Sequence, residues 1–199
     1  MKVFVAGGAG YIGSICVEEL LDAGHEVSVF DNLSEGHRVA VDERAQFIEG
    51  CLSDRVTTLN AVASTQAEAV MHFAAFAQVE ESMSDPSKYF RNNVANGINL
   101  LDASVEAGVK KFVFSSTAAT YGMPNGLHYT TSKAAVIGLT RGLAREVGRF
   151  NIRVNAVAPN VVNTAATGEV FGDKRDKIVE VTLSQQAIRK PLETGDIVG

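Results

Sequence analysis

The feature that most constrains the fold of this chain is a run of glycines directly after a short apolar segment near its start. Residues 2–6 (KVFVA) favour a strand, and residues 7–13 (GGAGYIG) follow with the spacing G-x-x-G-x-x-G. Residues 12–23 then carry apolar side chains at helical spacing up to Gly24, a residue type that commonly ends helices. A strand, a glycine loop and a helix in this order predict a phosphate-binding βα unit.

The three glycines of this loop have separate physical roles. Gly7 permits the tight turn, Gly10 lets the backbone approach a pyrophosphate, and Gly13 lets the helix pack closely on the strand. The backbone N–H groups at the helix start, around Tyr11 and Ile12, then bind the anion. The loop therefore predicts a dinucleotide site.

An acidic residue supports the same prediction. Asp31 ends the second predicted strand, where its carboxylate can accept hydrogen bonds from both ribose hydroxyls of an adenosine. With no arginine or lysine beside it, this carboxylate would repel a 2′-phosphate, so the sequence favours NAD over NADP.

Short β-prone runs alternate with longer helical stretches along the chain. The predicted strands are residues 2–6, 26–30, 46–49, 69–74, 110–115 and 152–158. The predicted helices are residues 12–23, 54–64, 86–107 with a break near 92–93, 129–149 and about 173–187. This alternation is typical of a parallel sheet covered by helices. We therefore predict a doubly wound α/β (Rossmann) fold of about six strands, in a single NAD(P)-binding domain over residues 1–199.

Composition and charge exclude several other classes of protein. The 199 residues are 46% hydrophobic with a net charge of −5, which excludes disorder and disfavours a nucleic-acid partner. No apolar run is long enough to span a membrane, and the apolar start is too short for a signal peptide. Cys16 and Cys51 are far apart and the four histidines are isolated, so no metal site is expected. We expect a cytoplasmic protein with a small-molecule substrate and no membrane partner.

A tyrosine and a lysine form the candidate catalytic pair. Tyr129 and Lys133 stand four residues apart at the start of a predicted helix, on one helical face. A free phenol has a pKa of about 10 and is a poor base at neutral pH, but a nearby cation stabilises the phenolate. Ser115, Ser116 and Thr117 end the preceding strand and offer hydroxyls that can hold a substrate oxygen. Together they predict acid–base chemistry at a hydroxyl or carbonyl, although turn formation alone also explains the hydroxyl trio.

The chain resembles the short-chain dehydrogenase/reductase family over nearly all of its length. Residues 1–123 are similar to the extended branch, which includes UDP-glucose 4-epimerases. The motifs are GGAGYIGS, Asp31-Asn32-Leu33, HFAA at 72–75, NNVANG at 92–97 and FSSTAATYG at 114–122. Residues 127–199 resemble the single-domain branch, such as 3-oxoacyl-carrier-protein reductases, through YTTSKAAVIGLTRGLAREVGRFNIRVNAVAP. A junction near 123–128 would make the chain a natural recombinant or an engineered chimera.

The resemblance implies roles for the catalytic residues. Tyr129 donates or accepts the proton at the substrate oxygen, and Lys133 tunes Tyr129 and binds the nicotinamide ribose. The epimerase register nominates Thr117 as the active hydroxyl, whereas the single-domain register nominates Ser116, which we slightly prefer. Asn93 matches the asparagine that supports the lysine through a water in the single-domain branch.

The resemblance also implies the cofactor contacts and shows where this chain departs from the family. Besides the glycine loop and the catalytic residues, the expected NAD contacts are Asn32, Leu52, Phe73, Ala74, Ala75, Pro159, Val162 and Thr164. Cys51 stands where epimerases usually have an adenine-binding aspartate, and Ala77 replaces the lysine expected after HFAA. Asn160 replaces the glycine usually found after Pro159. These departures predict weaker NAD binding.

The function expected from the sequence is NAD-dependent hydride transfer to or from a small alcohol or carbonyl compound, with low activity. The alternatives are a catalytically idle NAD-binding scaffold and a residual UDP-sugar 4-epimerase. The family's last helix and seventh strand are expected to be absent. A homodimer through the helices at 86–107 and 129–149 is expected, since both carry alanine and glycine on their outer faces and form the dimer interface in the family.

Overall fold

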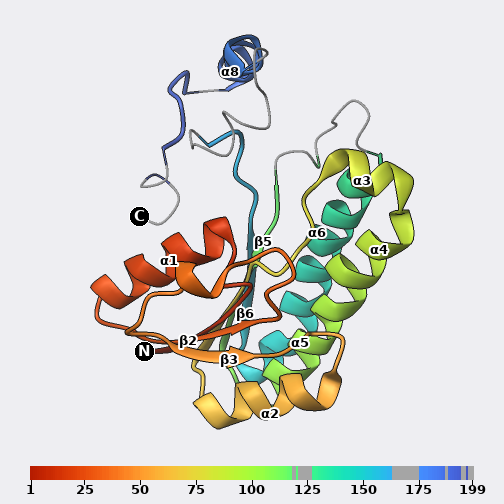
Figure 1. The fold of residues 1–199 in the computed structure, drawn as a ribbon. Helices are drawn as coiled ribbons and strands as arrows, with labels where there is room; N and C mark the ends of the chain where they lie inside the picture. The colour runs from red at the N-terminus through yellow and green to blue at the C-terminus, as the bar shows by residue number, and fades with distance from the viewer. Residues whose placement is uncertain (118–119, 121–126, 163–174, 187, 194–195, 197–199) are drawn as a thin grey trace.

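The fold is a six-stranded parallel sheet with helices on both faces, as the sequence predicts. The computed structural model describes residues 1–117, 120, 127–162, 175–186, 188–193 and 196. The sheet order is β3-β2-β1-β4-β5-β6 (Figure 1). The strands are β1 (Lys2–Ala6), β2 (Glu26–Asp31), β3 (Gln46–Glu49), β4 (Ala69–His72), β5 (Lys111–Ser115) and β6 (Arg153–Val157). The order reverses between β1 and β4, which is the position where such sheets bind ligands at the carboxyl ends of their strands.

The predicted helices form within a few residues of their expected positions, and one further helix, α3, is present. They are α1 (Tyr11–Asp22), α2 (Arg55–Thr65), α3 (Val79–Ser84), α4 (Pro86–Phe90), α5 (Asn96–Glu106), α6 (Leu127–Val147) and α8 (Arg175–Gln185). Short 3-10 turns occupy Arg38–Ala40 and Gly148–Phe150. Figure 1 shows α1 on one side of the sheet, α2, α5 and α6 on the other, and α8 away from the sheet beyond its carboxyl edge.

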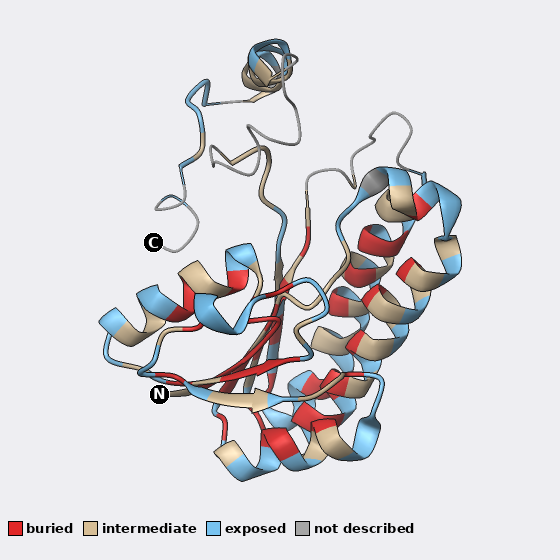
Figure 2. Ribbon diagram, viewed as in Figure 1, coloured by how far each residue is buried: buried red, intermediate tan, exposed pale blue. Residues whose placement is uncertain are grey.

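Alternating side chains divide the core between the two sheet faces. On β1, Val3 and Val5 pack with Val17 of α1, whereas Phe4 and Ala6 join the larger cluster under the other helices. That larger cluster includes Leu100 of α5 and Val136 of α6 as well as Val62 of α2. Figure 2 shows the buried residues along the strands and on the inner sides of α5 and α6.

The predicted helix at 86–107 is interrupted near the residues where a break was expected. The Asp85 carboxylate accepts a hydrogen bond from the Lys88 N–H (3.1 Å) and Pro86 occupies the first turn, so α4 begins with a cap. Residues Arg91–Ala95 then form a π-turn before α5. Such turns occur often at functional sites. The sequence did not predict α3, which begins at Val79 without a side-chain cap.

The predicted strand at 69–74 is two residues too long. The Phe73 N–H still donates to the Ala6 carbonyl (2.7 Å), but β4 ends at His72. Beyond it the chain leaves the sheet and crosses against Gly7, because a Cβ built on Gly7 would lie 2.4 Å from Ala74 N. This crossing brings the segment after β4 onto the glycine loop.

After β6 the chain makes one further strand-like contact, an isolated parallel bridge between Val162 and Leu192. Within the described ranges no seventh strand joins the sheet beside β6. No helix in the described part of the chain is long and apolar enough to cross a membrane.

Candidate active site

The glycine loop is a tight turn that leaves no room for a side chain at Gly7 and Gly13. Gly7 has a φ of +83°, in the left-handed region that favours glycine. A Cβ on Gly13 would lie 2.1 Å from the Gly7 carbonyl oxygen, so α1 packs directly against the turn. Gly10 is different, since its nearest contact would be at 3.4 Å. The loop geometry thus matches the separate roles predicted for Gly7 and Gly13.

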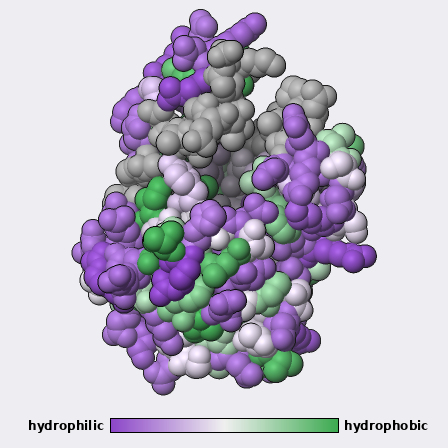
Figure 3. Space-filling model, in the orientation of Figure 1, coloured by the Kyte–Doolittle hydropathy of each residue, from purple (hydrophilic) through white to green (hydrophobic). Residues whose placement is uncertain are grey.

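The N-terminus of α1 is open toward solvent. Its cap residue, Gly10, offers no side chain to the first N–H groups, and the first turn carries no acidic residue. Tyr11 and Ile12 in that turn are 48% and 54% exposed. The face of the molecule drawn in Figure 3 is mostly hydrophilic, with hydrophobic side chains gathered near its centre. Uncapped N–H groups at a helix start are favourable for an anion such as a pyrophosphate.

Asp31 is buried at the end of β2 and holds the glycine loop. One carboxylate oxygen accepts the Ala9 N–H (3.0 Å) and the other accepts the Leu33 N–H (2.8 Å). A carboxylate has about four acceptor positions, so two remain for hydroxyl donors. Asp31 therefore fits the predicted ribose contact while also fixing the loop, a role that the sequence did not reveal.

The other predicted cofactor contacts follow the carboxyl ends of β2, β3, β4 and β6. Asn32 Nδ2 donates to the Cys51 sulfur (3.6 Å), and Leu52 is buried in the core. Phe73, Ala74 and Ala75 are half-buried on the segment that crosses Gly7. Pro159 and Val162 are half-buried after β6, and Thr164 lies outside the described residues.

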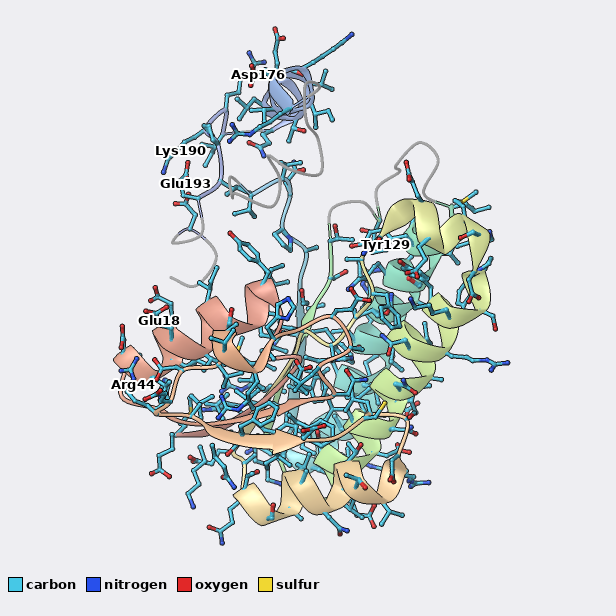
Figure 4. All side chains as sticks on the ribbon, in the orientation of Figure 1. Glu18, Arg44, Tyr129, Asp176, Lys190 and Glu193 are labelled. Atoms are coloured by element: carbon cyan, nitrogen blue, oxygen red, sulfur yellow. The ribbon has the colours of Figure 1, made fainter. Side chains whose placement is uncertain are left out.

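Tyr129 and Lys133 lie on the first turns of α6. Figure 4 shows Tyr129 at the end of α6 where that helix begins, and Lys133 reaches the Ser115 carbonyl at the end of β5. Tyr129 and Thr117 share a hydrogen bond between their side chains. Burial raises the pKa of Tyr129, and the hydrogen bond from Thr117 partly offsets this by stabilising the phenolate. Tyr129 is therefore a protonated phenol at neutral pH, suited to donate a proton to a substrate oxygen.

Lys133 is a buried charge, with 5% of its surface exposed. Its Nζ donates to the Ser115 carbonyl oxygen (3.1 Å), which ties α6 to the end of β5. Burial lowers the pKa of Lys133 to about 8, so the ammonium form still predominates at neutral pH. A cation held one helical turn from Tyr129 is the arrangement that the sequence predicts.

The two candidate hydroxyls have different environments. Thr117 contacts Tyr129, whereas the Ser116 hydroxyl is buried and has no hydrogen-bond partner among the described residues. The Ser116 N–H donates to the Val157 carbonyl (2.6 Å), which continues the ladder between β5 and β6. The geometry thus favours Thr117, the residue nominated by the epimerase register, as the hydroxyl beside the phenol.

Asn93 is buried in the π-turn and joins three segments. Its Oδ1 accepts the Phe76 N–H (2.9 Å), and its Nδ2 donates to the Phe76 carbonyl (3.0 Å). Nδ2 also lies 3.5 Å from Ser132 Oγ, next to Lys133, and Asn92 Nδ2 donates to Oδ1 (3.0 Å). These contacts tie the π-turn to the segment after β4 and to α6, and the support of Lys133 by Asn93 through a water stays a prediction.

Sequence reasoning missed His72 as part of this site. His72 ends β4, is 5% exposed, and has an Nδ1 atom without a hydrogen-bond partner among the described residues. Burial, helped by the charge of Lys133, lowers its pKa to about 3. The signal was present, because a titratable residue at the end of a buried strand, within HFAA, stands at the edge where ligands bind.

Comparison with known proteins finds a family and several relatives that this chain matches. Residues 3–152 match the NAD dependent epimerase/dehydratase family. The chain is 52% identical to the UDP-glucose 4-epimerase of Lacticaseibacillus casei over 124 residues, which are 62% of this chain and 38% of the relative. It is 50% identical to the enzyme of Lactobacillus helveticus over 130 residues, 65% of this chain and 39% of that one. The chain thus spans about two fifths of the length of these curated relatives.

Comparison with solved structures also finds UDP-glucose 4-epimerases. The UDP-glucose 4-epimerase of Thermus thermophilus, in complex with NAD, matches with a TM-score of 0.79 and 29% identity. That match covers 100% of this chain and 72% of the other. The enzyme of Brucella ovis, also in complex with NAD, matches with a TM-score of 0.71 and 36% identity over 80% of this chain and 51% of the other. The family match crosses residues 123–128 without interruption, so a chimeric junction there stays a prediction.

Proposed function

Because the chain belongs to the NAD dependent epimerase/dehydratase family, we propose that it is the NAD-binding, catalytic part of a nucleotide-sugar epimerase. The observation that carries this proposal is the hydrogen bond between Thr117 and Tyr129, one helical turn from the buried Lys133. Thr117 is the hydroxyl that the epimerase register nominates, whereas Tyr129 lies in the segment that resembles the single-domain branch. The use of Thr117 at the phenol, together with the family match, favours the epimerase alternative over a simple alcohol dehydrogenase.

The residues present fit NAD. The turn at Gly7 and the contact at Gly13 leave no room for side chains, the first N–H groups of α1 are uncapped, and Asp31 keeps free acceptor positions. The N–H groups would hold the pyrophosphate, and Asp31 would hold the adenosine ribose. A buried carboxylate at Asp31 disfavours a 2′-phosphate, which supports NAD over NADP. When bound, NAD supplies the reversible hydride acceptor that the amino-acid side chains lack.

The side chains supply orientation and a proton. Thr117 positions a substrate hydroxyl against Tyr129, whose phenol exchanges the proton at that oxygen. Lys133 stabilises the phenolate when it forms, since its ammonium lies on the same face of α6. Reversible oxidation of a sugar carbinol needs one such acid–base group at the reacting oxygen. Since the chain spans about two fifths of its curated relatives, the UDP-sugar substrate is part of the proposal.

The first test is whether NAD binds and UDP-galactose is converted. We expect fluorescence titration to show NAD binding, with NADP at least about 10-fold weaker. We expect slow interconversion of UDP-galactose and UDP-glucose that Tyr129→Phe abolishes. Loss of NAD binding would contradict the proposal altogether. NAD binding with alcohol oxidation but no epimerisation would instead support the dehydrogenase reading of the sequence.

A pair of variants tests which hydroxyl acts at the site. Thr117→Val keeps the shape of the side chain and removes its hydrogen bond, and Ser116→Ala removes the neighbouring hydroxyl. We expect Thr117→Val to lower kcat by about 10- to 100-fold, because a hydrogen bond to a reacting group contributes on the order of 1.5–3 kcal/mol. Ser116→Ala should lower kcat much less. The reverse order would return the assignment to Ser116.

A further inference from the structure

Two buried polar atoms beside the candidate active site have no hydrogen-bond partner among the described residues. They are Nδ1 of His72 and Oγ of Ser116, and each residue is 5% exposed. An unpaired buried polar group costs on the order of 1–3 kcal/mol, so native proteins rarely leave two such groups together. Their joint occurrence indicates that a small polar molecule completes the site.

The sheet places the two side chains on the same face. His72 pairs with Phe114 across β4 and β5, and Ser116 stands two residues beyond Phe114 in the extended chain. From the strand spacing and rise, the Cα atoms of His72 and Ser116 are about 8 Å apart. A Cβ built on Gly97 would lie 3.4 Å from His72 Nε2 and 3.8 Å from Phe114 Cε1, so α5 covers this face.

The Lys133 ammonium, which comes from α6, also lies near the end of β5 that carries Ser116. Successive residues of a parallel strand direct their backbone groups to opposite neighbours, and the Ser116 N–H points to Val157 of β6. The Ser115 carbonyl therefore faces the β4 side, and Lys133 Nζ lies 3.1 Å from it. An ammonium has three N–H donors, and the described residues give Lys133 one acceptor.

We propose that one buried water molecule joins His72 Nδ1, Ser116 Oγ and Lys133 Nζ, and that His72 and Ser116 are positioning residues that hold the lysine through it. Three hydrogen-bonding partners are the usual number for a buried water. The water accepts a hydrogen bond from Lys133 and donates one to Nδ1 and one to Oγ. His72 then carries its proton on Nε2. The neutral imidazole that this requires agrees with its lowered pKa.

The water explains two features of the site. It gives Ser116 a partner that turns its hydroxyl away from Tyr129, which leaves Thr117 as the hydroxyl at the phenol. It also fixes the direction of the Lys133 ammonium, so that its remaining donor can point toward the cofactor ribose and Tyr129. The second consequence rests on the proposed function, whereas the water itself does not.

The direct test is a high-resolution crystal structure of the chain without NAD, combined with nitrogen-15 NMR of the histidine rings. We expect a water within about 3.2 Å of all three atoms. We also expect His72 as the Nε2–H tautomer, unchanged between pH 5 and 8. An empty space, or a His72 Nδ1–H donating to a protein carbonyl, would overturn the proposal. If the water is present but NAD does not bind, the proposed function fails and this inference stands.

Three variants test the positioning role. Ser116→Ala removes one partner of the water, and His72→Phe removes another while keeping a ring against Phe114. Ser115→Ala is the matched control, because Lys133 contacts only the backbone carbonyl of that residue. With carbon-13 labelled lysine, we expect both test variants to lower the pKa of Lys133 by about half a unit or more.

The control should leave the lysine titration unchanged. A titration that is the same in Ser116→Ala and in the unaltered protein would contradict the positioning role. Ser116→Ala is a small change that keeps the test available if His72→Phe does not fold. We further expect Ser116→Ala to raise the KM for NAD several-fold, an effect that Ser115→Ala should not share.

Discussion

At the residue scale, Lys133 exemplifies a functional group that costs stability. Burial lowers its pKa from 10.5 to about 8. Between these two values the unfolded chain binds more protons than the folded chain, so the free energy of unfolding rises with pH. Below pH 8 both states bind the proton, and the folded protein carries the full cost of the buried charge, on the order of 3 kcal/mol.

We therefore expect Lys133→Met to stabilise the protein at pH 7 and to abolish catalysis. The thioether chain fills similar space without a charge, although the hydrogen bond to Ser115 O is lost, so the gain is about 1–2 kcal/mol. The gain should shrink as the pH rises from 8 to about 9.5, because the free energy of unfolding of the unaltered protein increases over this range. Urea unfolding of both proteins across this range measures the difference. A variant that is less stable at pH 7 would contradict the prediction.

The sequence could predict some of these residues and not others. Tyr129 and Lys133 follow from a four-residue spacing at a helix start, which local geometry largely determines. The choice between Ser116 and Thr117 depends on which side chain faces α6. The contribution of His72 depends on packing against α5. Neither is encoded in local spacing, so the structure was needed to find them.

At the element scale, Gly13 determines how closely α1 packs on the glycine loop. A Cβ there would lie 2.1 Å from the Gly7 carbonyl, so Gly13→Ala must displace the loop or the helix. We expect a destabilisation of about 1–3 kcal/mol and at least a roughly 10-fold weaker binding of NAD. Urea unfolding and NAD titration measure the two effects.

Gly10→Ala is the control for this change. Its Cβ would lie 3.4 Å from the nearest atom, on a backbone with φ −79° that alanine readily adopts. We expect its stability to change by less than about 1 kcal/mol, even if the closer approach of a ligand is impaired. Equal destabilisation by the two substitutions would show that the contact at Gly13 is not decisive.

The π-turn is the second element with a testable role. Asn93 binds both backbone groups of Phe76, so Asn93→Ala removes the partner of a partly buried N–H and of a partly buried carbonyl. We expect a loss of about 2–4 kcal/mol in the free energy of unfolding. Asn92→Ala, at a half-buried neighbour, should cost less than half as much. Thermal unfolding of the two variants measures the contrast, and similar losses would contradict it.

The elements themselves were largely predictable because each has a local signal. Short apolar runs predict strands such as the one at residues 26–30, and Asp85-Pro86 predicts the start of α4. The end of β4 was predicted too late, since residues 73–74 leave the sheet to cross Gly7, a contact between distant segments. For α3 the sequence offered no capping side chain at Gln78 from which to predict a start.

At the scale of the whole molecule, the outer faces of α5 and α6 are the surfaces on which the expected homodimer depends. On α6, Ala134, Gly138 and Gly142 are exposed, and a Cβ on either glycine would meet nothing within 4 Å. On α5, Ile98 and Val105 are each 41% exposed. Small residues on one helix beside apolar residues on the next suit close packing against a second copy. We expect light scattering to give twice the mass of the chain.

The sign of the change in melting temperature caused by Gly142→Ala distinguishes a dimer from a monomer. In a monomer the added methyl group meets only solvent, and the better helix propensity of alanine stabilises α6 by about 1 kcal/mol. In a closely packed dimer the same methyl group separates the two subunits, so the melting temperature falls and becomes more dependent on protein concentration. Gly148→Ala, just beyond the end of α6 and equally open, is the control. A melting temperature that rises in Gly142→Ala and does not depend on concentration would contradict the dimer, because only a free α6 surface gains from the substitution.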